Sequence, residues 1–333
     1  MGFPLRTEIK IEKSNLCVDY NTPMLFVGSC FSDNVGGILS RLKFPVMSNP
    51  FGVLYNPVSI SNSIDIAINR SDIVEEDLIF QNNLWHSFSF HGSFSNIDKN
   101  TVVRNCNDSI LKARKFMKTA QCLFVTFGTA WVFESIETKQ IVSNCHKLPS
   151  RQFKRFRLTV EEIVSDWKGL IARIQEFNPA LKIIFTVSPV RHFKDGAHEN
   201  QLSKSTLLLA VDEIIKSCPV NQIEYFPAYE IVNDELRDYR FYANDMVHIS
   251  ETGIRFIFER FKESYLTSPA LAILSEIDDI VTAKEHRILS EDVVSIRKFG
   301  ASMLKKIEKL NNIYPHINFK PEFEYFKNLE GIE

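Results

Sequence analysis

The sequence has 333 residues, of which 44% are hydrophobic and 24% are charged, and its formal net charge is -2 at pH 7. This length and composition are ordinary for a soluble globular protein that buries a large core. The near balance of charge gives no bias toward nucleic acid or anionic lipid, and no run of about 18 apolar residues predicts a membrane span. We therefore expect neither nucleic acid nor a membrane among the partners.

The first residues, MGFPLRTEIKIEK, lack the apolar segment of a signal peptide, so we expect a cytoplasmic protein. The six cysteines show neither a CxxC pair nor the spacing of zinc ligands, and we expect free thiols. Glycine-rich phosphate loops are absent, and the histidines lack the tight spacing of a metal site. The sequence therefore predicts neither a cofactor nor a metal.

Four short apolar runs predict a parallel sheet that is buried on both faces. A helical pattern follows the first run and precedes each of the other three, and Thr159 and Glu162 have the spacing of a capping box. This alternation indicates a doubly wound α/β domain. The expected strands span residues 24–27, 122–127, 181–187 and 223–226.

Two further regions complete the predicted organisation. Residues from about 45 to 105 are rich in Gly, Pro, Asn and Ser, which predicts loops that line a pocket. After Phe261, two helical patterns without intervening strands and then a tail predict a helical appendage, through which the chain could form an oligomer. We therefore expect two domains, at residues 1–265 and 266–333.

Small and polar residues follow each predicted strand. The first strand ends at Gly28, the second at Gly128, and the third at SPVRH, residues 188–192. Ligands bind outside the carboxyl ends of strands in open parallel sheets, because the loops converge there. The sequence therefore predicts a site at this edge of the sheet.

The corner VGSCFS, residues 27–32, offers two nucleophiles, Ser29 and Cys30. A strand-to-helix corner fixes an attacking atom, and the first N–H groups of the helix stabilise an anion there. Cys30 at such a helix start is expected to have a lowered pKa. The alternative interpretation is a tight turn of small residues with a buried cysteine.

A second motif, Asp245-x-x-His248, follows the last predicted strand and precedes a helix. A carboxylate three residues before a histidine can hydrogen-bond the imidazole, which fixes its tautomer and stabilises the imidazolium. Its place in the sequence is that of the last two members of a nucleophile-first triad.

Six segments together resemble the motifs of the GSCFA-domain family: GSCFS, NPFGVLYNP, FGTAWVFE, NCHKLP, SPVRHFKDG and ELRDYRFYANDMVH. The resemblance runs from about Asp19 to Phe261 and implies a branch of the SGNH, or GDSL-like, hydrolases. It implies a flavodoxin-like, mostly parallel sheet with a nucleophile, Gly and Asn donors for an oxyanion, and a D-x-x-H pair.

Carried over residue by residue, the resemblance assigns the D-x-x-H pair to Asp245 and His248. It aligns Cys30 with the nucleophilic serine of the hydrolases and Ser29 with the aspartate that precedes that serine. Cys30 is therefore the preferred nucleophile and Ser29 its rival. A Cys–His–Asp set suits acyl transfer because a thiolate needs less activation by a base than a hydroxyl does.

The resemblance also implies oxyanion donors. Gly128 matches one family glycine, and Gly52 is a candidate for another. The Asn expected two residues after Gly128 is Ala130 here, so that donor comes from elsewhere. Asn56 and Asn144 are the candidates.

Further motif residues are candidates for contacts with substrate. His146 and His192 lie in predicted loops, and Arg191 suits a carboxylate or phosphate through its planar fork. The alternative for Arg191 is an ion pair with an acid such as Asp195 or Asp238. His86 and His91 are expected to be pocket walls.

These observations predict an SGNH-like acyl-ester hydrolase or an acyltransferase that uses a nucleophile-His-Asp set. Its expected substrate is a small molecule or carbohydrate carrying an O-acyl group such as acetyl, a choice that rests on fold analogy. A transferase with an acyl-coenzyme A donor would use the same residues. The alternative is a non-catalytic module that binds a glycan or acyl group in the same pocket.

Overall fold

The computed structural model describes residues 7–218, 222–286 and 292–331, and the chain forms two compact units. The first unit contains Pro23–Gly36 and Val46–Phe261 together with the described residues up to Glu12. The second contains Lys13–Thr22, Gly37–Pro45 and the residues from Lys262 onward. All residues of the predicted site belong to the first unit.

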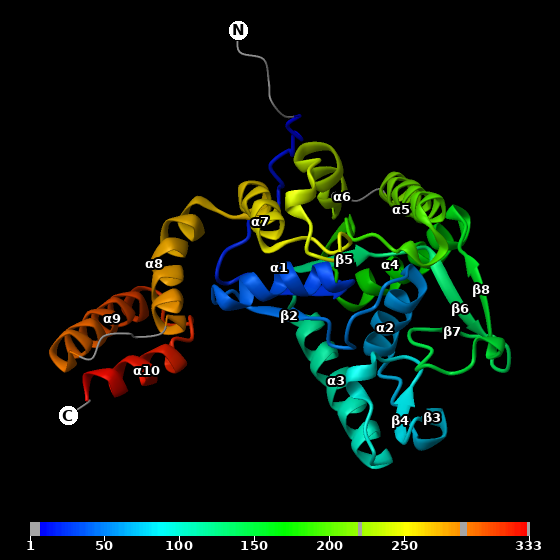
Figure 1. Ribbon diagram of the computed structural model, residues 1–333, viewed down its shortest axis with the longest axis horizontal. Coiled ribbons are helices and arrows are strands. Elements are labelled where there is room, and N and C mark those ends of the chain that lie inside the picture. The colour runs from blue at the N-terminus through cyan, green and yellow to red at the C-terminus, as the bar shows by residue number, and fades with distance from the viewer. Residues whose placement is uncertain (1–6, 219–221, 287–291, 332–333) are drawn as a thin grey trace, which may run out of the picture. The chain divides into compact units, whose positions relative to one another are not determined.

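A five-stranded parallel sheet forms the centre of the first unit (Figure 1). With the strands numbered along the chain, their spatial order is that of flavodoxin-like folds, so the predicted doubly wound fold is confirmed. The four predicted strands are present, and a fifth was not predicted because it is short and only half-buried. In spatial order they are β2 (Val46–Ser48), β1 (Met24–Gly28), β5 (Cys122–Phe127), β9 (Lys182–Val187) and β10 (Ile223–Tyr225).

Apolar side chains cover both faces of the sheet. Leu25 and Val27 belong to one large core cluster, whereas Phe26 stacks on Phe124 with ring centroids 4.5 Å apart on the other face. The cluster is covered by α2 (Pro57–Asn69), α3 (Lys99–Thr119), α4 (Val160–Phe177) and α5 (Ala197–Ser217). The other face packs against α1 (Cys30–Arg41) and α7 (Glu251–Tyr265), and the short α6 (Ala228–Glu230) follows β10.

Two small antiparallel sheets flank the site. The region from residue 45 to 105 is not only loops, as the sequence analysis expected, because it contains α2 and a hairpin. Asn56 caps α2, and the pattern Pro57 to Ile68 buries one apolar face. The hairpin pairs β3 (Leu78–Gln81) with β4 (Leu84–Ser87). The second sheet lies in the connection from β5 to α4. Its strand order is β7 (Ile141–Val142), β6 (Trp131–Ser135), β8 (Phe153–Arg157).

The second unit is helical. The two predicted helices are present, and the predicted tail is wrong, because it forms a third helix that packs closely on the second. A Cβ on Gly300 would lie 2.9 Å from the carbonyl oxygen of Phe326, so only glycine permits this approach. The predicted domain boundary after residue 265 stays a prediction. The helices are α8 (Ser268–Glu285), α9 (Val293–Ile313) and α10 (Lys320–Glu330).

The predicted capping box of α4 is confirmed: Thr159 and Glu162 exchange hydrogen bonds between side chain and backbone. Among the helices in the described ranges, none is long and apolar enough to cross a membrane.

Candidate active site

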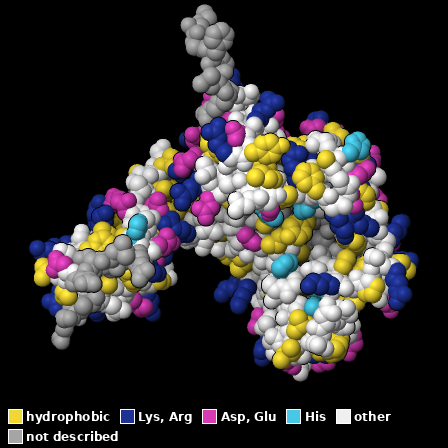
Figure 2. Space-filling model, viewed as in Figure 1, with side chains coloured by type: hydrophobic (Ala, Val, Ile, Leu, Met, Phe, Trp, Pro, Cys, Tyr) yellow, Lys and Arg dark blue, Asp and Glu magenta, His cyan; other side chains and the backbone are white. Residues whose placement is uncertain are grey.

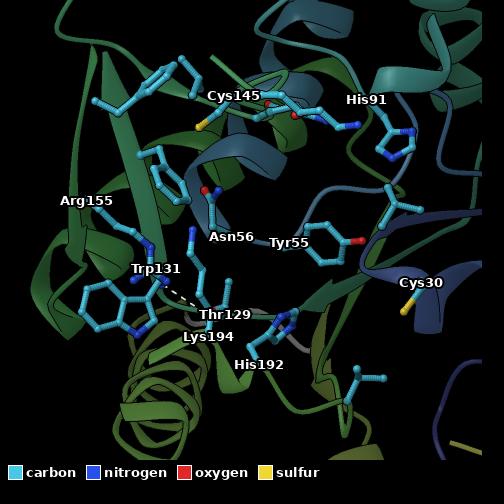
Figure 3. A pocket seen from close by; sticks show the side chains of 18 of the residues that line it. Cys30, Tyr55, Asn56, His91, Thr129, Trp131, Cys145, Arg155, His192 and Lys194 are labelled. Atoms are coloured by element: carbon cyan, nitrogen blue, oxygen red, sulfur yellow. Dashed lines mark hydrogen bonds between the residues drawn. The ribbon is translucent and has the colours of Figure 1, made fainter. Parts of the chain in front are cut away.

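A cavity of about 730 Å³ opens at the carboxyl ends of β1, β5 and β9. Cys30 follows β1, Thr129 follows β5 and His192 follows β9, and all three line it (Figure 3). Figure 2 shows a hollow in this face of the unit, with apolar side chains inside it and histidines at its edge. The strand ends that the sequence analysis singled out therefore do meet.

The corner after β1 depends on Gly28. Its φ of +129° lies in a region that favours glycine, and a Cβ there would lie 2.2 Å from the carbonyl oxygen of Thr126. The chain then turns directly into α1, whose first residue is Cys30. Ser29 is only 1% exposed, and its Oγ accepts the N–H of Phe31 at 3.4 Å. Cys30 lines the cavity, whereas Ser29 does not.

The electrostatics of Cys30 differ from the expectation. Burial raises the pKa of its thiol, and the nearby Asp33 carboxylate raises this pKa further. The N–H groups of Cys30 and Phe31 and the Lys204 ammonium oppose these effects without reversing them. The predicted lowering of the Cys30 pKa is therefore wrong, because desolvation at this corner outweighs the helix start.

Asp33 is held in place by Asn49. The Nδ2 of Asn49 donates to Asp33 Oδ1 at 2.7 Å, and its Oδ1 accepts the N–H of Gly28 at 2.8 Å. Burial raises the pKa of Asp33, and the hydrogen bond from Asn49 opposes this effect. One asparagine thus connects the glycine of the corner to the acid beside Cys30.

Asp245 and His248 form the hydrogen-bonded pair that their spacing predicts. His248 Nδ1 lies 2.6 Å from Asp245 Oδ2, and Asp245 Oδ1 accepts the N–H groups of Val247 and His248 at 2.9 Å each. These hydrogen bonds, led by the one from the imidazole, lower the pKa of Asp245 to about 2. Because Nδ1 faces the carboxylate, Nε2 is the nitrogen left to exchange a proton in the cavity that His248 lines.

The two predicted glycine donors are already engaged. The N–H of Gly128 donates to the carbonyl oxygen of Tyr55 at 2.8 Å, and the N–H of Gly52 donates to the backbone carbonyl oxygen of Asn49 at 2.8 Å. Gly52 has a φ of +77° and packs against His91, which itself lines the cavity. Both amides therefore already have a backbone acceptor within the protein.

The candidate asparagines also have internal partners. Asn56 lines the cavity, but its Oδ1 accepts the N–H of Ser59 and its Nδ2 donates to Ser59 Oγ at 2.9 Å. Asn144 lines the cavity as well, and its Oδ1 accepts the N–H of His146. Ala130, where the resemblance implies an asparagine, is fully buried.

His192 has an unpaired ring nitrogen. Its Nε2 is buried and has no hydrogen-bond partner within the described residues. A Cβ on Gly128 would lie 3.4 Å from this Nε2 and equally far from Ser29 Cβ, so His192 stands beside the β1 corner. Burial, assisted by the charges of Lys204 and His248, lowers the pKa of His192 to about 4, and the imidazole is neutral at pH 7.

A buried lysine below the site was missed by the sequence analysis. Lys204 on α5 is fully buried, and its Nζ donates to the carbonyl oxygens of Gly128 at 2.6 Å and Ser188 at 2.7 Å. Burial lowers its pKa to about 7. Its signal is in the sequence, because Lys204 shares a helical stripe with the buried Leu207 and Val211.

Two of the predicted histidines lie outside the cavity. His146 is buried, with its Nε2 2.8 Å from the carbonyl oxygen of Ser87 and its ring stacked on His86 at 4.4 Å. His86 is fixed between Ser95 and Gln81. The structure does not bring His146 or His86 to the cavity surface, since their ring nitrogens serve to join loops.

Arg191 does line the cavity, and it forms neither of the ion pairs considered above. Its Nη2 donates to Asn233 Oδ1 at 2.9 Å, and Asp195 pairs with Arg155 instead. Arg155 stacks on Trp131 at 4.4 Å, and both residues come from the β6–β8 sheet. Within the described ranges, no three His, Cys, Asp or Glu side chains are placed to hold a metal ion.

Two parts of the chain match sequence families. Residues 23–261 match the GSCFA family, and residues 277–329 match the family described as GSCFA domain protein, C-terminal domain. No curated protein matches the chain.

Solved structures with distant similarity include a carbohydrate esterase family 3 protein from Talaromyces cellulolyticus, at 9% identity and a TM-score of 0.35, covering 78% of this chain and 99% of that one. An acetyl esterase mutant with acetate ion matches at 10% identity and a TM-score of 0.34, with the same coverage. An acetyl xylan esterase from Butyrivibrio proteoclasticus matches at 9% identity and a TM-score of 0.36, covering 73% of this chain and 62% of that one. At these identities the similarity concerns the fold alone.

Proposed function

This chain belongs to the GSCFA family, and from that premise we propose that it is an acyl-ester hydrolase or acyltransferase with Cys30 as its nucleophile. The observation that carries the proposal is one cavity lined by both Cys30 and His248, with Asp245 bonded to the far nitrogen of His248. Nucleophile, base and orienting acid are the minimal set for acyl transfer.

The first step is attack on the ester. Because the pKa of the Cys30 thiol is raised, the group is protonated at neutral pH and needs a base during attack. His248 Nε2 accepts the proton as Sγ bonds to the carbonyl carbon, and Asp245 stabilises the imidazolium through Nδ1. The C–O bond then breaks, and His248 returns the proton to the leaving oxygen.

The negative charge on the carbonyl oxygen needs donors. The backbone N–H groups of Cys30 and Phe31 already point toward the sulfur and favour an anion at this corner. We assign the donor that Ala130 cannot supply to His192, a neutral imidazole beside Gly128 whose Nε2 has no partner among the described residues. A proton on His192 Nε2 would form a hydrogen bond to the oxyanion.

The second step releases the acyl group from sulfur. His248 accepts a proton from water in a hydrolase, or from an acceptor hydroxyl in a transferase, and the new oxygen displaces the thiolate, which regains the proton. The expected acyl group is acetyl or another O-acyl group on a carbohydrate or small molecule, by analogy at the level of the fold.

Turnover of a small acetyl ester tests the proposal. We expect Cys30→Ala and His248→Ala each to lower kcat by at least about a thousandfold, while far-ultraviolet circular dichroism stays that of the wild type. Cys218→Ala is the matched control, since this thiol lies outside the cavity, and it should keep full activity. Full activity of Cys30→Ala would refute the role of Cys30.

Acceptor choice is a separate measurement. Adding acyl-coenzyme A and candidate hydroxyl acceptors distinguishes transferase from hydrolase, because only a transferase speeds thioester consumption when the acceptor is present. A wild-type chain that binds acetyl esters without turning them over would instead be a binding module.

A further inference from the structure

Positive charge in the cavity has no acidic counterpart on the cavity wall. The side chains that line it include Lys147, Arg155, Arg191 and Lys194, and none of the described lining residues is Asp or Glu. Three histidines line it in addition to these four cations. Lys147 and Lys194 are exposed and Arg191 is half-buried, so this surplus of positive charge faces both the cavity and solvent, and a neutral ester has no need of it.

Among the described residues, a nearby acid neutralises only one of these four cations. Arg155 forms a two-pronged ion pair with Asp195, whereas Arg191 donates to the neutral amide of Asn233. No carboxylate within the described ranges lies at ion-pair distance from Lys147, Arg191 or Lys194. Three cations are therefore available to a ligand.

Two of the cations converge on one part of the wall. Lys194 and Arg155 both lie close enough to Cys145 to lower the pKa of its thiol against the effect of burial, which raises that pKa to about 11. Lys194 Nζ also lies 4.9 Å from the ring centroid of Phe133, and Arg155 packs on the same ring. Figure 3 shows Arg155, Trp131 and Lys194 on the side of the cavity away from Cys30.

The same wall is aromatic. Trp131, Phe133 and Phe153 line the cavity and come from the β6–β8 sheet. Apolar rings in a cavity with cations beside them suit a ring-shaped group that carries a negative charge. The nucleophile, in contrast, lies at the end of β1, so the two functions occupy separate parts of one cavity.

We propose that this wall is a subsite for an anionic group, a carboxylate or a phosphate, carried by the substrate on a ring that packs against Trp131 and Phe133. The proposal rests on the proposed function for the identity of the reacting ester, but not for the binding of the anion. Lys194 is its principal ligand, while Arg191 and the exposed Lys147 add positive charge elsewhere in the same cavity.

Binding to the Cys30→Ala protein tests the subsite without turnover. The ligands are benzoate, phenyl phosphate and the neutral benzyl alcohol, each followed by calorimetry at low salt. We expect both anions to bind at least about tenfold more tightly than the alcohol, and Lys194→Met to remove about tenfold of the anion affinity. Whichever of benzoate and phenyl phosphate binds more tightly identifies the anion that the subsite favours.

The control is Lys154→Met, which removes an exposed cation from β8 that lies on Phe156 outside the cavity and should leave anion binding unchanged. Equal affinity for benzyl alcohol and both anions overturns the subsite, as does anion binding that Lys194→Met leaves intact.

Turnover separates the subsite from the proposed function. Wild-type kcat/KM should be higher for 4-acetoxybenzoate than for phenyl acetate, and Lys194→Met should reduce this ratio about tenfold. Anion binding without turnover of either ester leaves the subsite standing and refutes the proposed function. Turnover of both esters at equal kcat/KM, without anion binding, refutes the subsite alone.

Discussion

The ammonium of Lys204 donates a hydrogen bond to the carbonyl oxygen of Gly128 over 2.6 Å, in a fully buried position below the candidate active site. A second hydrogen bond to Ser188 joins the carboxyl ends of β5 and β9 through one side chain. The same ammonium opposes the burial-induced rise in the Cys30 pKa and lowers that of His192. Lys204 therefore both joins two strand ends of the site and influences the pKa values of Cys30 and His192.

Replacing Lys204 by Met should change the pH dependence of stability. The folded pKa of Lys204 is about 7, below its ordinary value of 10.5, so between these values the unfolded chain binds a proton that the folded chain does not. The free energy of unfolding of the wild type should rise with pH across this window, by up to about 1.4 kcal/mol per unit, relative to that of Lys204→Met. Urea unfolding of both proteins between pH 7 and 10.5 measures the difference in their free energies of unfolding. The cysteines also titrate in this range, but they are present in both proteins, so their effect cancels. A difference that does not change with pH would contradict the low pKa of Lys204.

Asp33→Asn should make Cys30 more acidic. The Asp33 carboxylate raises the pKa of the thiol, so its removal should lower that pKa. The rate of iodoacetamide alkylation at Cys30, followed by mass spectrometry against pH, reports the change. Asp108→Asn, an exposed carboxylate on α3, is the control and should leave the Cys30 profile in place.

His192→Ala should reduce catalysis more than His192→Gln. Loss of an oxyanion donor lowers kcat by about a hundredfold, and glutamine restores an N–H at similar reach. His198→Gln, an exposed histidine on α5, should keep the wild-type kcat for an acetyl ester. If the Ala and Gln variants lose only binding, with KM raised and kcat unchanged, His192 is not the oxyanion donor.

The pH dependence of stability tests whether His192 is held neutral. Its folded pKa of about 4 lies below its ordinary value of 6.5, so the unfolded chain binds the proton first as the pH falls. The wild type should lose stability between these values relative to His192→Gln, by an amount on the order of 1–3 kcal/mol. Parallel unfolding curves across this window would show that His192 is not held neutral. His146, which titrates similarly, is present in both proteins and cancels.

Gly28→Ala should be strongly destabilising. Its Cβ would collide with the Thr126 carbonyl, and its φ is one that alanine rarely adopts, so we expect a loss of at least about 2 kcal/mol. Gly37→Ala in α1 is the matched control, because a Cβ there meets no atom within 4 Å and alanine favours a helix by about 1 kcal/mol. Thermal unfolding should move in opposite directions for the two variants.

The long periodic segments made the fold predictable. Runs such as Cys122–Phe127 are buried on both faces, and the capping box at Thr159 marks where α4 begins. β2 and the β7-β6-β8 sheet were missed because their strands are short and carry mixed polar and apolar residues. Their formation depends on pairing with neighbours distant in sequence, which no local pattern reports.

The candidate site was predictable to the extent that it lies in motifs. The Asp245–His248 bond follows from spacing alone, since residues three apart in a tight loop can face each other. The Cys30 pKa could not be read from the helix start, because desolvation depends on what covers the corner. The engagement of Gly128 by Tyr55 likewise depends on a long-range contact.

The β7-β6-β8 sheet enters the chain as an insert within a single crossover, while the corner after β1 and the Asp245–His248 loop lie elsewhere along the sequence. Substitutions in this segment can change the aromatic rings and Arg155 of the wall without changing Lys194 or the groups assigned to bond-making. The aromatic rings of the proposed subsite and the proposed catalytic groups thus come from different segments of the chain. A chimaera that exchanges only residues 131–157 should therefore change which ring the cavity accepts, while Lys194 keeps its charge in the cavity.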